Sequence, residues 1–156
     1  MAIDKVKEYL KGYNRDKDIQ EFNTSSATVE LAAQVLGVIP ARIAKTMSFK
    51  DDDGCILIVS AGDTKVDNSK FKKQFKLKAK MLSLEEVEPL TGHEVGGVCP
   101  FANPNNTRVY LDISMKRFET VFPACGSHNS AIELNLDDLY TYSKAIEWID
   151  VCKGWE

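Results

Sequence analysis

Two short segments hold the residues of this 156-residue chain whose types and spacing could do chemistry. In residues 95–101 (VGGVCPF), two adjacent glycines and Pro100 predict a rigid loop whose bare backbone can approach a ligand closely. Upstream, Lys45 stands in the mainly apolar stretch 43–46, an unusual place for a charge without a compensating partner or substrate. Backbone N–H groups of the loop could hold a carbonyl or oxyanion, while the ammonium holds a phosphate or carboxylate.

Each of these features also has a plainer interpretation. A lone lysine at a strand edge is most often a surface residue whose ammonium reaches solvent. A Gly-Gly-x-x-Pro string is most often a plain turn. Residue types alone therefore leave a functional site and an ordinary surface both open.

Length and composition favour one domain, residues 1–156, of an ordinary globular protein with 44% hydrophobic and 28% charged residues. The apolar run 55–59 is too short to cross a bilayer, and residues 1–7 lack a signal-peptide core. We therefore expect a cytoplasmic protein without a membrane partner. Its four cysteines, 55, 99, 125 and 152, lack C-x-x-C spacing and are expected to be free thiols.

The net charge of −3 conceals a basic segment. Residues 65–80 contain seven lysines against one acid, Asp67. Such a run can steer a polyanion to one face, although it is more often solvated surface. The interleaved Phe71, Phe75 and Leu77 are expected to anchor the segment in the core.

Helices and strands alternate without a regular βαβ rhythm, which predicts an α+β fold with a mixed, curved, barrel-like β-sheet and surrounding helices. An Asp-Gly between two β-prone runs predicts a hairpin at residues 51–54. Expected helices span 3–10, 29–36, 68–75, 84–91, 114–118 and 136–142, with caps at Thr28, Asp67 or Asn68, Ser83 and Asn135. Expected strands span 19–23, 46–50, 55–60, 78–82, 107–113, 119–124, 131–134 and 145–151.

Nearly the whole chain resembles the YbaK/EbsC family, which includes the editing insertion domain of bacterial prolyl-tRNA synthetases. The resemblance is carried by a Thr-Gly-x-x-x-Gly-Gly-x-x-Pro string that follows an Ile-x-Lys-Thr at a fixed distance. Further matching segments are 28–38 (TVELAAQVLGV), 66–70 (VDNSK), 90–101 (LTGHEVGGVCPF), 109–112 (VYLD), 124–126 (ACG), 132–134 (IEL) and 137–139 (DDL).

This resemblance implies a freestanding enzyme that hydrolyses the ester of a mischarged aminoacyl-tRNA, a small amino acid such as Cys or Ala on a tRNA for proline. The substrate's own groups replace an enzyme nucleophile, no cofactor or metal is needed, and prolyl-tRNA synthetase is a possible partner, whereas DNA is not. Lys45 falls on the family's essential lysine, and Gly96, Gly97 and Pro100 fall in the loop that contacts the ester. The implied substrate pocket includes Phe22, Thr28, Cys99, Asp112 and Gly126. With tRNA as the substrate, the charge of the basic segment makes Lys70, Lys72, Lys73 and Lys76 the expected tRNA contacts.

The sequence is also compatible with three rival interpretations. Cys99 or Cys125 with His93 or His128 could form a thiol-nucleophile site. The same four residues could be read as zinc ligands, although their spacing is irregular. The same fold could also bind tRNA or a synthetase without turnover.

Overall fold

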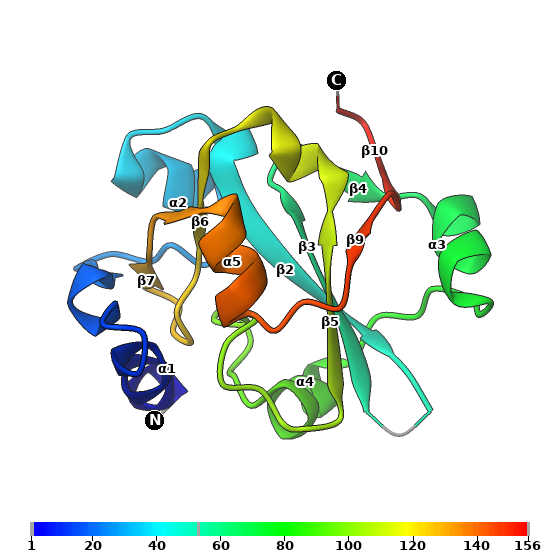
Figure 1. Cartoon of the computed structure of the whole chain (residues 1–156), viewed down its shortest axis with the longest axis horizontal. Helices are drawn as coiled ribbons and strands as arrows, with labels where there is room; N and C mark the ends of the chain where they lie inside the picture. The colour runs from blue at the N-terminus through cyan, green and yellow to red at the C-terminus, as the bar shows by residue number, and fades with distance from the viewer. Residues whose placement is uncertain (1, 53, 156) are drawn as a thin grey trace.

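The computed structural model describes residues 2–52 and 54–155 (Figure 1). The α-helices are α1 (Ala2–Lys11), α2 (Val29–Leu36), α3 (Asn68–Phe75), α4 (Leu84–Thr91) and α5 (Leu136–Tyr142). The strands are β1 (Gln20–Glu21), β2 (Ile43–Lys50), β3 (Cys55–Ala61), β4 (Lys65–Val66), β5 (Thr107–Asp112), β6 (Thr120–Pro123), β7 (Ser130–Ala131), β8 (Leu134–Asn135), β9 (Trp148–Ile149) and β10 (Cys152–Lys153). Short 3₁₀ helices span Asp16–Asp18, Pro40–Arg42 and Ile113–Arg117.

A curled six-stranded sheet in the order β8-β6-β2-β3-β5-β9 forms the centre of the molecule. β2 pairs antiparallel with β3, whereas β2–β6, β3–β5 and β5–β9 are parallel pairs. Helix α5 lies in front of this sheet, α3 stands at one end of the molecule and α2 at the other (Figure 1). The predicted α+β fold with a mixed, curved sheet is therefore confirmed.

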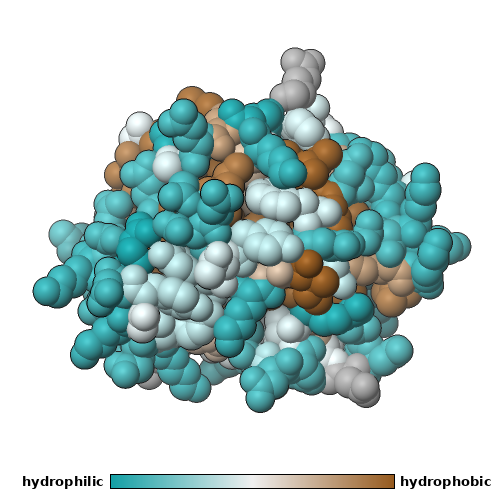
Figure 2. Space-filling view, in the orientation of Figure 1, coloured by the Kyte–Doolittle hydropathy of each residue, from teal (hydrophilic) through white to brown (hydrophobic). Residues whose placement is uncertain are grey.

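Strand β3 is the centre of the core, because every one of its seven residues is buried. Its alternate residues Leu57 and Val59 pack in one cluster, together with Val6 and Leu10 of α1. Ile56 and Ile58 face the other cluster, which contains Phe71 of α3. Burial of both faces explains why the strand reads as a continuous apolar run. The face seen in Figure 2 is mainly hydrophilic, with small separate hydrophobic areas.

The helix starts follow the sequence closely. The side chains of Thr28, Asp67 and Asn135 each accept a backbone N–H from the first turn of the following helix. Ser83 and Glu86 form a capping box at the start of α4. These contacts confirm the predicted caps, with Asp67 as the residue that caps α3.

The predicted hairpin is present, with Lys50 paired to Cys55 across β2 and β3. Gly54 packs tightly there, since a Cβ atom on it would lie 2.6 Å from the carbonyl oxygen of Asn106. Asp53, part of the predicted turn, lies outside the described residues. Close backbone approach is thus one reason for glycine at this position.

The predicted strand 78–82 is wrong, because only one isolated bridge forms there, between Phe49 and Met81. The amide of Lys50 donates to the carbonyl of Lys80 (2.8 Å), and that of Leu82 donates to Ser48 (3.2 Å). Residues 77–82 must bridge from the end of α3 to the cap of α4, so few remain to follow β2. The described chain therefore leaves the middle of this β2 edge, residues 45–47, without a strand neighbour, because β6 pairs only with Ile43 and Ala44.

Other boundaries also differ from prediction. The expected strand 131–134 is two strands, because β7 pairs with β1 while β8 pairs with β6. The expected helix 114–118 is the 3₁₀ helix Ile113–Arg117. The expected last strand is shortened to β9, and the first to β1. Across residues 2–52 and 54–155, no helix is both long and apolar enough to cross a membrane.

Candidate functional site

A cavity of about 330 Å³ opens beside the unpaired middle of β2. Helices α2 and α4 form two of its walls, and the loop after α4 supplies a third. Lys45 and Gly96, from the two segments singled out in the sequence, both line it. Its lining is otherwise largely apolar, with Thr28, Thr46, Ser26, Ser48 and Ser130 as polar members.

Lys45 is half-buried and its ammonium donates a hydrogen bond to the backbone carbonyl of Thr64. Burial lowers the pKa of this lysine from its ordinary value, and the nearby Cys152 and Asp63 only partly oppose that effect. The Thr64 hydroxyl in turn donates to the carbonyl of Ala61 (2.7 Å), which fixes this turn. An incompletely compensated ammonium favours an anionic or carbonyl group supplied by a ligand.

The two loop glycines have different surroundings. Gly96 lines the cavity with φ +90°, which favours glycine, and its amide makes no hydrogen bond within the described chain. Gly97 is buried and does not line the cavity, and its amide already donates to the carbonyl of Glu94 (3.0 Å). A Cβ atom on Gly97 would lie 2.8 Å from the backbone nitrogen of Ser127. Gly97 therefore sets the backbone packing of the loop, whereas Gly96 meets the cavity.

The remaining predicted pocket residues are dispersed. Thr28 lines the cavity, although its hydroxyl also caps α2. Phe22 lines none of the cavities described here, and its backbone pairs with Asn129. Pro100 borders a different cavity of about 270 Å³. Gly126 borders a third, of about 150 Å³, beside the start of α1.

Asp112 lies away from the cavity and is completely buried at the end of β5. One carboxylate oxygen accepts the amide of Ser114 (3.0 Å), and the other accepts the amide of Val151 (2.9 Å). Both oxygens thus hold backbone segments against β5. The geometry gives this acid a supporting position instead of a place in the cavity wall.

Cys99 and His93 lie close together but are sealed in the core, with the sulfur 3.4 Å from His93 Nε2. That nitrogen also lies 2.7 Å from the carbonyl of Phe101, which can only accept, so Nε2 carries the proton. Burial raises the pKa of the Cys99 thiol to about 12 and lowers the pKa of His93. A protonated nitrogen facing a protonated thiol does not form the activated pair that a thiol nucleophile needs.

The buried His93 makes stability depend on pH. Because burial holds the folded pKa below the ordinary 6.5, its contribution to the unfolding free energy is complete above 6.5. It is lost as pH falls from there through the folded pKa, at up to about 1.4 kcal/mol per pH unit. Urea unfolding at pH 7.5 and 5.5 should show a larger loss for the wild type than for His93→Gln. Equal losses in the two proteins would contradict this role for His93.

The other two members of the rival set do not supply an activated thiol either, because burial and the neighbouring Cys99 raise the pKa of Cys125. Cys125 is buried, whereas His128 is exposed and lies 3.3 Å from Glu94 through Nδ1. Among the residues that the structure describes, no group of three or more His, Cys, Asp or Glu is arranged to hold a metal ion. All four cysteines are free thiols, as the sequence predicted, and all four are buried.

The sequence did not single out several residues of the cavity. The Thr46 hydroxyl is buried without a hydrogen-bond partner in the described part of the chain. Because Thr46 follows Lys45 directly in the sequence, its position could have identified it as a candidate residue of the cavity. Met81, Leu84 and Val95 are exposed hydrophobic residues at the cavity. Their meeting depends on long-range packing, which no local pattern reveals.

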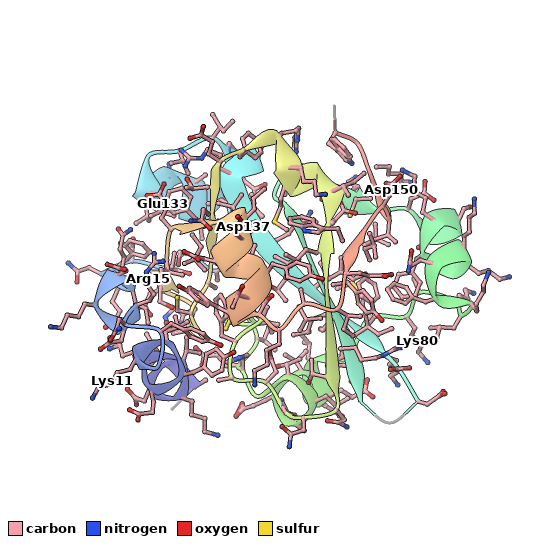
Figure 3. The ribbon with its side chains drawn as sticks, in the orientation of Figure 1. Lys11, Arg15, Lys80, Glu133, Asp137 and Asp150 are labelled. Carbon is pink, nitrogen blue, oxygen red and sulfur yellow. The ribbon has the colours of Figure 1, made fainter. Side chains whose placement is uncertain are left out.

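The basic segment lies around α3, away from the lining of this cavity. Lys72, Lys73 and Lys76 are exposed, whereas Lys70 pairs with Asp150 (3.0 Å), a contact that raises the pKa of Lys70. Asp150 and Lys80 are both labelled on the α3 side of the molecule in Figure 3. Phe71 is fully buried and Phe75 and Leu77 pack against the same cluster, which confirms them as core anchors.

Comparisons with known proteins identify the family and the fold. Residues 24–142 match the family model described as an aminoacyl-tRNA editing domain. The uncharacterized protein YwhH of Bacillus subtilis is 55% identical over 157 residues, covering 100% of both chains. A proline–tRNA ligase of Caldicellulosiruptor bescii is 29% identical over 93% of this chain, which spans only 26% of that ligase. The crystal structure of a candidate trans-editing enzyme for prolyl-tRNA synthetase superposes with TM-score 0.88 at 24% identity, covering 98% of each chain.

Proposed function

Because the chain belongs to the aminoacyl-tRNA editing domain family, we propose that it is a freestanding deacylase that hydrolyses mischarged aminoacyl-tRNA. The observation that carries this proposal is one cavity lined by both Lys45 and Gly96. The cavity is mainly apolar and of limited volume, which suits a small acyl group such as alanyl or cysteinyl. The chain is similar to a segment that makes up 26% of a proline–tRNA ligase, and this similarity supports a tRNA for proline as the carrier of the acyl group.

In the proposed reaction, water adds across the ester, the bond between the carbonyl carbon and the ribose oxygen breaks, and the proton goes to that oxygen. An aminoacyl ester is already activated, so positioning and charge stabilisation can supply most of the rate. Lys45 orients the substrate, while the unpartnered amide of Gly96 faces the developing oxyanion. Thr46 offers a hydroxyl at the same cavity.

No side chain of the protein acts as the nucleophile in this proposal. The neighbouring ribose hydroxyl orients the attacking water. In a cysteinyl ester the thiol can instead attack its own carbonyl carbon, which breaks the bond to the ribose oxygen and passes the thiol proton to that oxygen. Water then opens the resulting thiolactone to free cysteine. Editing is needed because a synthetase site rejects a side chain smaller by one methylene by only about 1–3 kcal/mol. Gly97 supports the cavity through the packing of its loop, whereas Pro100, Phe22, Asp112 and Gly126 lie outside the lining and take no direct part in the proposed reaction.

A panel of mischarged tRNAs tests this function. Purified protein is mixed with tRNA for proline carrying alanine, cysteine or proline, with and without prolyl-tRNA synthetase. We expect release of alanine or cysteine and retention of proline. Binding of all three without release of any amino acid would favour the non-catalytic binding module and refute the deacylase.

Replacement of Cys99 by serine separates the proposal from the thiol-nucleophile rival. The thiol is buried, its pKa is raised to about 12 and it does not line the cavity, so Cys99→Ser should retain near wild-type deacylation. Measured initial rates on the best substrate of the panel give the answer. Complete loss of release in a variant that folds normally would favour the rival.

The exposed lysines at α3 are proposed to guide tRNA. Changing Lys72, Lys73 and Lys76 together to glutamine should weaken tRNA binding and reduce the slope of log K against log salt by about two. A matched control changes the exposed Lys5, Lys11 and Lys17, so the loss of charge is identical. An equal effect of both triple variants would indicate that only net charge matters and that α3 has no special part.

A further inference from the structure

A second groove of about 330 Å³ adjoins the cavity. Lys45, Met47 and Phe49 line it, and as alternate residues of β2 they project from one face of that strand. Lys65 of β4 and Ala79 line it as well. Lys45, Met47 and Met81 border both hollows, so the two are neighbours across the open edge of β2.

The groove combines an apolar floor with cations at its margin. Met47, Val66 and Ala79 supply partly exposed apolar surface above the buried Phe49, whereas Lys65 and Asn68 are exposed and polar. Lys153 is paired with Lys65 across β10 and β4, which adds a second cation nearby. Apolar surface next to lysines suits a nucleoside, because the base can contact the apolar side chains while the ammonium groups approach the phosphate. A purely apolar peptide side chain would make no favourable electrostatic contact with these ammonium groups.

We propose that this second groove binds the terminal nucleoside of the tRNA, while the acyl group occupies the first cavity. This inference rests on the proposed deacylase function. Since the ester joins ribose to acyl group, it must lie where the hollows meet, against the residues that they share. Lys45 is the charged member of that set, and its ammonium has further protons beyond the one donated to Thr64. Lys65 would contact the phosphate on the 5′ side.

The test uses an uncharged tRNA acceptor-stem hairpin with its complete CCA end, and the same RNA without the terminal adenosine. For the wild type, removal of this nucleoside should weaken binding about tenfold, as the loss of one stacked base does. Ala79→Trp fills the groove and should bring the ratio of the two affinities close to one. Thr141→Trp, at an exposed position on α5, should keep the wild-type ratio. An unchanged ratio in a folded Ala79→Trp variant overturns the proposal.

A second measurement needs no variant. Adenosine 5′-monophosphate is titrated into wild-type protein, and the backbone amide shifts are followed by NMR. Shifts at Lys65, Val66, Asn68 and Ala79 support the groove, whereas shifts confined to Ala27, Thr28 and Gly96, or no saturable shifts, overturn it.

Turnover of mischarged tRNA with no effect of Ala79→Trp on the ratio of the two RNA affinities would reject only the nucleoside groove. A nucleoside-dependent ratio without turnover would reject only the deacylase.

Discussion

Replacing Lys45 by alanine is expected to reduce deacylation at least about 10²-fold, because the ester is no longer held in its reactive orientation. The fold should tolerate the change, because the described contacts of the ammonium comprise one hydrogen bond to the Thr64 carbonyl. Losing that bond should alter the unfolding free energy by no more than about 1 kcal/mol. Single-turnover rates on mischarged tRNA and urea unfolding of the same preparations measure the two effects.

Two further variants separate charge from packing. Lys45→Met keeps much of the side-chain volume without the ammonium, so it should be as inactive as Lys45→Ala. Lys11→Ala removes an exposed lysine at the end of α1, on the side of the molecule opposite α3 (Figure 3), and should remain active. Wild-type rates in Lys45→Met would show that the charge has no part in the reaction.

Gly97→Ala should have the second large effect, through the backbone. The added methyl group would lie 2.8 Å from both the nitrogen and the Cα of Ser127, so the loop and the 126–129 turn must separate. Overpacking of this kind costs about 1–3 kcal/mol of unfolding free energy. Because Gly96 moves with its neighbour, we also expect deacylation to fall about 10²-fold. Thermal unfolding and initial rates measure the two results.

Gly37→Ala is the matched control for that variant. Gly37 has φ +70° with no atom within 4 Å of the added Cβ, so alanine there meets backbone strain but no clash. It should lose about 1–2 kcal/mol of stability. Its activity should nevertheless remain, because Gly37 does not line the cavity. If both variants lost activity equally, reduced stability alone would account for the effect of Gly97→Ala.

Local signals predicted the local structure well. Caps such as Thr28 and Ser83 act within one helical turn, so residue types a few positions apart determine them. The hairpin of β2 and β3 is likewise set by adjacent residues. The strand predicted at 78–82 is wrong because composition does not reveal the geometry of the connection. Only a few residues join α3 to α4, so few of them can lie beside β2.

The site was predicted only in part, for a related reason. Lys45 and Gly96 were singled out, and they line one cavity. Asp112 and Pro100 were placed with them through the resemblance, but the structure locates both outside that lining. A motif identifies which residues are unusual, whereas sheet pairing and loop packing decide which of them share a surface. The second groove depends on β4, β2 and residue 79 together, a combination without any local pattern.

The missing neighbour along the middle of β2 has a consequence for how selectivity can change. The hollow is bounded there by a connecting segment and an exposed methionine, Met81, while the buried strand β3 lies on the opposite side of β2. Leu77 and Leu82 tie this segment to the hydrophobic clusters, whereas Met81 is exposed. Substitutions at Met81 can therefore widen or narrow the opening without disturbing the hydrophobic interior. Preference for one acyl group over another is, in this architecture, adjustable independently of the stability of the scaffold.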